Sequence, residues 1–126
     1  MQLDHVNLRT ARLAEMRRWY IEILGLVDGE RPPFDSTGAW LYAGESPIVH
    51  LVETPKHPPP EGALRLEHFA LRADEPMDAF LEKLKRAGIE AQLGYPPDAD
   101  FVQVNIHDPD GNHIHIDFHG EHRRST

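Results

Sequence analysis

LDHVNLR, residues 3–9, returns as LEHFALR, residues 66–72, and this repeat decides the fold. The two stretches share an acidic residue, a histidine, alternating apolar positions and an arginine at an offset of 63 residues. A second pair, IVHLV at 48–52 and HIHID at 113–117, matches at an offset of 65. The sequence therefore predicts a duplicated module, and each copy opens and closes with a strand that carries a histidine.

Each half also contains one predicted amphipathic helix. Apolar side chains recur at helical spacing from about residue 10 to residue 24, and Gly25 follows where a helix C-terminal glycine belongs. In the second half, Asp74 is expected to cap a helix that has Pro76 in its first turn and that ends before Gly88.

Short alternating segments after each helix predict strands, so each half is expected to be βαβββ. The turn DPDGN, residues 108–112, should reverse the chain tightly, because proline presets φ and glycine accepts a left-handed conformation. The resulting single domain comprises module one at about 1–53, a proline-rich connector at 54–62, module two at about 63–119 and a polar tail at 120–126.

Composition limits the class of partner. The chain has 126 residues, enough for one folded domain, and a net charge of −8. An acidic surface repels phosphate backbones and anionic lipids, so we expect a small-molecule substrate, no nucleic acid and no membrane partner. No basic and apolar leader is visible, which makes the cytoplasm the expected location. The absence of cysteine means that any metal ion must be held by nitrogen and oxygen.

Strand alternation places the four repeat-related histidines on one face. In the predicted strands, apolar side chains alternate with polar ones, and the polar set should point away from the helices. This set includes His5, His50, His68 and His115. A single histidine would be explained by a solvated face, but four at equivalent positions of a repeat favour a metal site. Imidazole suits one divalent cation such as zinc, iron, nickel or manganese.

Paired βαβββ modules, the two histidine strands, LGL at 24–26 and DPDGN together resemble the vicinal oxygen chelate superfamily. That superfamily includes glyoxalase I, extradiol dioxygenases, fosfomycin-modifying enzymes and bleomycin-binding proteins. The resemblance implies an α+β fold in which two modules form a curved, half-open mixed sheet with helices on the convex side. It also implies metal ligands at His5, His50, His68 and His115. Members pair modules within one chain or between two, and we expect a homodimer.

The chain departs from the usual pattern at one ligand. The family usually has glutamate at the position that His115 occupies here. Asp117, about 6.6 Å further along the strand, is too far away to replace it and is expected to accept a hydrogen bond from a ligand instead. Without that carboxylate, neither an isomerase proton shuttle nor the dioxygenase ligand set carries over directly.

We therefore expect a metal-dependent enzyme, a lyase, an isomerase or a dioxygenase, that acts on a small vicinally oxygenated substrate through oxyanion stabilisation. The alternative is a metal-free protein that binds or sequesters a small molecule such as an antibiotic. Residues predicted to contact the substrate are Trp40, Tyr42, Arg72, Gln103 and Asn105.

Overall fold

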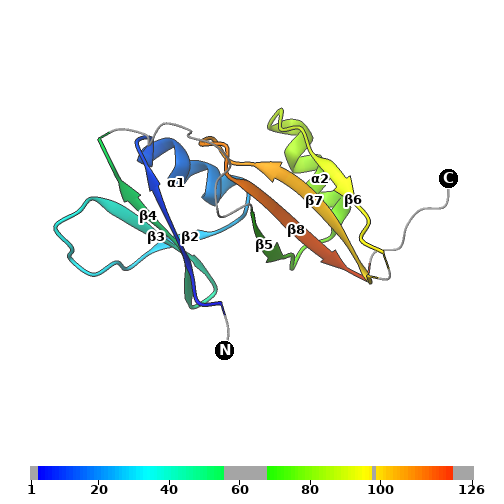
Figure 1. The fold of residues 1–126 in the computed structure, drawn as a ribbon, viewed down its shortest axis with the longest axis horizontal. Coiled ribbons are helices and arrows are strands. Elements are labelled where there is room, and N and C mark those ends of the chain that lie inside the picture. The colour runs from blue at the N-terminus through cyan, green and yellow to red at the C-terminus, as the bar shows by residue number, and fades with distance from the viewer. Residues whose placement is uncertain (1–2, 56–67, 98, 121–126) are drawn as a thin grey trace. The chain divides into compact units, whose positions relative to one another are not determined.

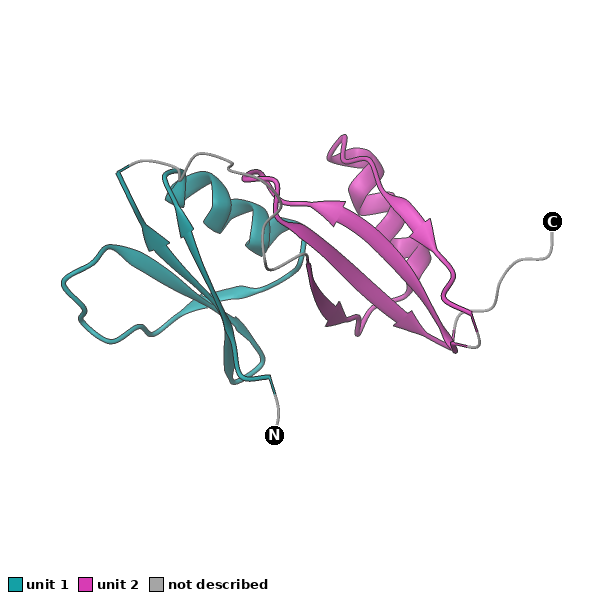
Figure 2. Cartoon of the chain, in the orientation of Figure 1, with its two compact units in different colours: residues 1–61 teal, residues 62–126 magenta. Residues whose placement is uncertain are grey.

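The computed structural model describes residues 3–55, 68–97 and 99–120. The chain forms two compact units, residues 1–61 and residues 62–126 (Figure 2). Each unit contains one helix and one four-stranded mixed sheet, which confirms the predicted α+β class with two βαβββ modules.

Unit 1 follows the predicted order of elements (Figure 1). Its strands line up as β1-β4-β3-β2, with β1 parallel to β4 and the other neighbours antiparallel. A parallel pair needs a long crossover, and the helix supplies it. The elements are β1 Val6–Thr10, α1 Leu13–Glu22, β2 Val27–Gly29, β3 Gly38–Ala43 and β4 Ser46–Glu53.

Unit 2 repeats this arrangement. Its strands line up as β5-β8-β7-β6, again with the first pair parallel and the others antiparallel. The elements are β5 Phe69–Arg72, α2 Met77–Arg86, β6 Gln92–Gly94, β7 Phe101–His107 and β8 His113–His119.

The strand register makes His50 and His115 equivalent. His50 on β4 lies opposite Asn7, two residues after His5. His115 on β8 lies opposite Ala70, two residues after His68. The offset of 65 residues that relates these two strands in the sequence therefore also relates equivalent positions in the structure.

Both helices are shorter than predicted, and both are followed by glycine in the left-handed region. Gly25 has φ of 71° and Gly88 has φ of 70°, conformations that side chains with a Cβ rarely adopt. The prediction that Asp74 caps α2 is wrong. Pro76, whose backbone is extended, occupies the N-cap position, so Asp74 lies two residues before the N-cap. Neither helix of the described residues is long and apolar enough to cross a membrane.

One face of each sheet packs against its helix and forms the core. In unit 2, Phe80 of α2 contacts Phe118 of β8 with ring centroids 5.6 Å apart. Alternate strand residues are buried, as predicted, so the intervening residues lie on the opposite face. The buried apolar side chains are Leu8, Met16, Tyr20, Ile23, Leu26, Ala39, Leu41, Val49 and Leu51 in unit 1, and Phe69, Phe80, Leu84, Val102, Val104, Ile106, Ile114, Ile116 and Phe118 in unit 2.

The predicted tight turn between β7 and β8 is present. The buried carboxylate of Asp108 accepts hydrogen bonds from the backbone N–H groups of Asp110 and Asn112 at 2.9 and 2.8 Å. It also accepts one from the side-chain amide of Asn112 at 2.8 Å. Gly111 has φ of 85°. This turn sets the pairing of β7 with β8 and so positions the histidines of β8.

Candidate functional site

In unit 1 the face opposite the helix carries a stack of three rings. The imidazole of His50 lies between that of His5, at a centroid distance of 3.9 Å and 10° between planes, and the indole of Trp40, at 4.0 Å and 11°. This stack explains why His50 is only 8% exposed although it points away from the core.

Hydrogen bonds define the free nitrogen of each imidazole in this stack. His50 Nε2 lies 2.9 Å from the carbonyl oxygen of Pro47, which can only accept, so Nε2 carries the proton and Nδ1 keeps its lone pair. His5 Nδ1 lies 2.6 Å from Asp4 Oδ2, which leaves its Nε2 available. Burial is the main reason that the pKa of His50 lies below its ordinary value, and the charges of His5 and Arg31 act in the same direction. The neutral form, which can bind a metal, is therefore favoured.

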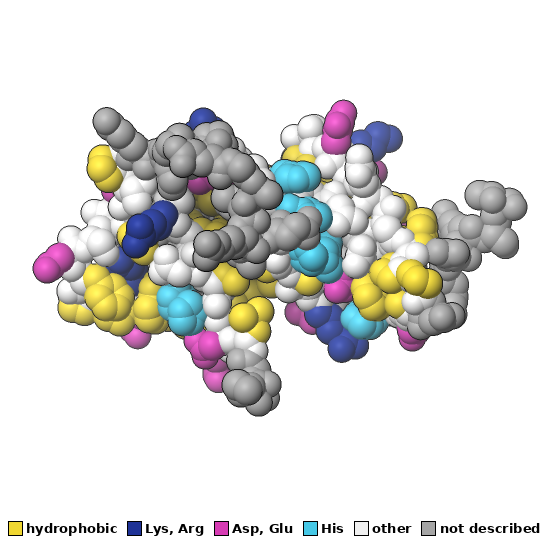
Figure 3. Space-filling model, viewed as in Figure 1, with side chains coloured by type: hydrophobic (Ala, Val, Ile, Leu, Met, Phe, Trp, Pro, Cys, Tyr) yellow, Lys and Arg dark blue, Asp and Glu magenta, His cyan; other side chains and the backbone are white. Residues whose placement is uncertain are grey.

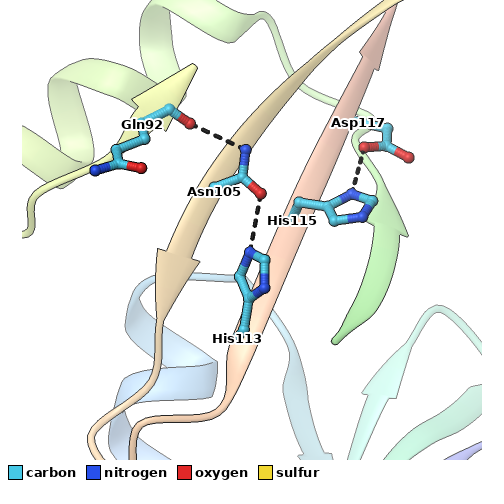
Figure 4. Close-up of polar contacts among 5 residues, drawn as sticks. All are labelled: Gln92, Asn105, His113, His115 and Asp117. Atoms are coloured by element: carbon cyan, nitrogen blue, oxygen red, sulfur yellow. Dashed lines mark hydrogen bonds and ion pairs between the residues drawn. The ribbon is translucent and has the colours of Figure 1, made fainter. Parts of the chain in front are cut away.

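In unit 2 the other two predicted ligands also lie together. The rings of His68 and His115 have centroids 4.4 Å apart. His115 donates from Nδ1 to Asp117 Oδ1 at 2.8 Å, and both side chains are largely buried (Figure 4). The other ring nitrogen of His115, Nε2, takes no part in this bond. Asp117 thus accepts a hydrogen bond from His115, and its role beside a metal ligand stays a prediction.

Sequence reasoning gave no role to His113, yet the structure holds it in the same way. Its Nε2 donates to Asn105 Oδ1 at 2.9 Å, and the Asn105 amide in turn donates to the carbonyl oxygen of Gln92 at 3.1 Å (Figure 4). The second bond fixes which way the amide points and hence which nitrogen of His113 is protonated. His113 lies 5.3 Å from His68 and 5.2 Å from His107 between ring centroids. Histidine side chains form a strip on this unit (Figure 3).

The predicted substrate contacts occupy different environments. Tyr42 donates its hydroxyl to the carbonyl oxygen of Glu30 at 2.6 Å, which ties β3 to the end of β2. Gln103 is half-buried on β7, where it lies opposite Asp117. Arg72 is exposed at the end of β5. Trp40 and Asn105 occupy equivalent positions, because each lies directly opposite the buried histidine of its own unit.

Two residues beside the unit 1 stack were also missed by sequence reasoning. Phe34 lies 6.2 Å from Trp40 between ring centroids, and the guanidinium carbon of Arg31 lies 5.0 Å from the centroid of Phe34. Both residues are in the loop between β2 and β3, where no periodic pattern marks them.

All four histidines are of a residue type that commonly binds divalent metals. Each unit brings two of them together, and on His5, His50 and His115 one ring nitrogen is hydrogen-bonded to a protein acceptor. Protein metal sites hold their histidines in this way. No group of three or more histidine, aspartate or glutamate side chains suited to hold a metal occurs among the residues that the structure describes.

The sequence matches the model of the Glyoxalase/Bleomycin resistance protein/Dioxygenase superfamily over residues 2–116, and the chain belongs to this superfamily. A comparison with curated proteins gave no match.

Several solved structures share this fold. A glyoxalase family protein from Bacillus anthracis has a TM-score of 0.76 at 24% identity, with 94% of this chain and 95% of that chain covered. A glyoxalase/dioxygenase from Nostoc punctiforme has a TM-score of 0.76 at 22% identity, covering 95% and 92%. Lactoylglutathione lyase from Agrobacterium tumefaciens has a TM-score of 0.66 at 20% identity, covering 90% of each chain. At these identities the similarity establishes the fold.

Proposed function

We propose that the protein is a metal-dependent enzyme of glyoxalase or dioxygenase type that acts on a small substrate with adjacent oxygen atoms. One divalent cation, zinc, iron, nickel or manganese, is held by His5, His50, His68 and His115. The observation that carries this proposal is the hydrogen bonding of the imidazoles. Three of the four have one nitrogen held by Asp4, by the Pro47 carbonyl or by Asp117, and each keeps the other nitrogen for a ligand bond.

The chain's own groups prepare the histidines for that role. The Pro47 carbonyl and the Asp117 carboxylate select one tautomer each, and burial of His50 disfavours its protonation. A bound divalent cation supplies Lewis acidity that stabilises an oxyanion on the substrate. Because all four proposed ligands are neutral imidazoles, no ligand charge offsets that of the cation.

The residues that we propose to bind the substrate are Trp40, Tyr42, Arg72, Gln103 and Asn105. Trp40 offers an apolar ring next to His50. Gln103 and Asn105 offer amide groups on the face of β7 opposite its core side. Arg72 offers a positive charge to an anionic group. Lyase, isomerase and dioxygenase reactions all share the oxyanion step, and the chemistry beyond it depends on the substrate.

Elemental analysis of the purified protein tests the proposal. We expect one divalent cation per chain, and loss of at least tenfold in metal affinity on His68→Ala or His115→Ala. His119→Ala is the matched control, because His119 is an exposed histidine on the same strand. No metal above the level of the control preparation, together with ligand binding that a chelator does not change, would instead support the metal-free binding protein.

Two further expectations from the sequence remain proposals. We propose that the enzyme works as a homodimer and in the cytoplasm. Sedimentation analysis and fractionation of the native host cells test them.

A further inference from the structure

A row of four flat groups runs across unit 1 from a loop to the proposed ligand His50. The Arg31 guanidinium lies over Phe34, Phe34 lies beside Trp40, and Trp40 stacks on His50. Hydrophobic, basic and histidine side chains share this face of unit 1 in the space-filling view (Figure 3). Three of these groups are aromatic and the fourth is a delocalised cation, so the row favours flat ligands.

The side chain of Phe34 is largely exposed to solvent. Its side chain is 55% exposed, one of few large apolar residues in that state among those described. Exposing a large ring to water is unfavourable, and neighbouring aromatic rings would gain by a further stacked partner. Phe34 is therefore the part of the row with surface to offer a ligand.

The loop that carries Phe34 is held in place. Arg31 donates from one terminal nitrogen to the carbonyl oxygen of Ser36 at 2.9 Å and from the other to the Ser36 hydroxyl at 3.0 Å. The backbone N–H of Phe34 donates to the Pro32 carbonyl at 2.8 Å. A loop tied in this way loses little conformational freedom when a ligand binds.

Arg31 brings a positive charge to a strongly acidic chain. Both of its acceptors on Ser36 are neutral, and no carboxylate forms an ion pair with it in the ranges that the structure describes. Its Nε is buried and has no hydrogen-bond acceptor within those same ranges. In a protein of net charge −8, a guanidinium without a carboxylate partner favours an anionic ligand, and carboxylate matches its geometry.

We propose that Arg31, Phe34 and Trp40 form a subsite for a planar aromatic carboxylate. The ligand's ring stacks on Phe34 and Trp40, and its carboxylate meets Arg31. This inference rests on the proposed function, because it names the class of substrate that the enzyme takes. A purely structural role for Arg31, in which it only holds the loop, explains its bonds to Ser36. It explains neither the exposure of Phe34 nor the lack of a carboxylate partner for Arg31 among the described residues.

Binding of three small probes to the full chain tests the proposal. Benzoate is planar and anionic, cyclohexanecarboxylate has the same charge but a puckered ring, and benzamide is planar but neutral. Calorimetry and tryptophan emission, which includes that of Trp40, report binding. We expect benzoate to bind at least tenfold more tightly than either of the other probes. Equal affinity for all three overturns the proposal, and this comparison is made within one folded protein.

Variants identify the residues that are responsible. We expect Phe34→Leu, which keeps an apolar side chain, and Arg31→Gln, which removes the charge, each to weaken benzoate binding about tenfold. Ser36→Ala removes the hydroxyl that accepts a hydrogen bond from Arg31 but removes no proposed ligand contact. It should change benzoate affinity less than twofold. If Ser36→Ala weakens benzoate binding as much as Arg31→Gln does, Arg31 acts only by holding the loop and the proposal is wrong.

The metal measurement separates this inference from the proposed function. Benzoate binding with the full set of variant effects, but without stoichiometric metal, supports the subsite and contradicts the metal-dependent enzyme. Stoichiometric metal with no preference for benzoate supports the enzyme and contradicts the subsite.

Discussion

Replacing Asp117 should weaken metal binding without changing a single proposed ligand. Its carboxylate accepts a hydrogen bond from His115 Nδ1 at 2.8 Å, and the two side chains are 17% and 9% exposed. Loss of such a partner typically lowers metal affinity by about 10- to 100-fold, which is about 1.4 to 2.7 kcal/mol. Asp117→Asn keeps an acceptor but loses the charge, so we expect about tenfold. Asp117→Ala removes both, and we expect about 100-fold.

Competition with a fluorescent zinc chelator at neutral pH measures these affinities. Asp100→Asn is the matched control, since it makes the same change of charge at an exposed position before β7. A double-mutant cycle with His115→Ala should remove the effect of Asp117→Asn, because the carboxylate acts through that imidazole. If Asp117→Asn and Asp100→Asn weaken zinc binding equally, the assignment of His115 as a ligand oriented by Asp117 is refuted.

Three further predictions concern stability. The pKa of His50 is lowered in the folded chain, so the stability that this group contributes is present above its unfolded pKa of about 6.5 and is lost as the pH falls through the lowered value. In urea unfolding of the metal-free protein between pH ~7.5 and ~5, the unfolding free energy should therefore fall more for the native chain than for His50→Gln. Parallel pH curves for the two proteins would contradict this prediction. Leu84→Ala should cost about 3 kcal/mol in denaturant unfolding, because Leu84 is 1% exposed, and a loss below about 1 kcal/mol would mean that α2 packs differently. Asp108→Ala should cost about 2 kcal/mol by the same method, since its carboxylate accepts three hydrogen bonds in the turn, whereas an unchanged midpoint would show that the turn forms without them.

Much of the fold follows from local sequence patterns. The core faces of β7 and β8 are visible because apolar and polar residues alternate along most of each strand. Strands β2 and β6 were not located, since each has three residues and they expose Val27 and Leu93 by 62% and 41%. Such short edge strands are defined by their pairing with β3 and β7 and carry no periodic signal of their own.

For the candidate site, too, local patterns predict which face a residue occupies but not its contacts across strands. Alternation along residues 113–119 placed His115 on the face away from the helices, and the repeat placed His50 at the equivalent position. It could not show that Trp40 covers His50, because that contact depends on the register between β3 and β4, which also shifts between Leu41 and Tyr42. The bond from His113 to Asn105 likewise joins residues of two paired strands. Contacts across strands require the register, and a single sequence does not reveal it.

The equivalence of Trp40 and Asn105 has a consequence for the evolution of this chain. A duplicated scaffold offers each structural position twice, and selection can keep one function in both copies while it diversifies another. Here the strand facing each buried histidine carries an indole in one copy and an amide in the other. The same structural position therefore presents an aromatic ring in unit 1 and an amide group in unit 2, so the duplication has kept the buried histidine while the residue opposite it has diverged.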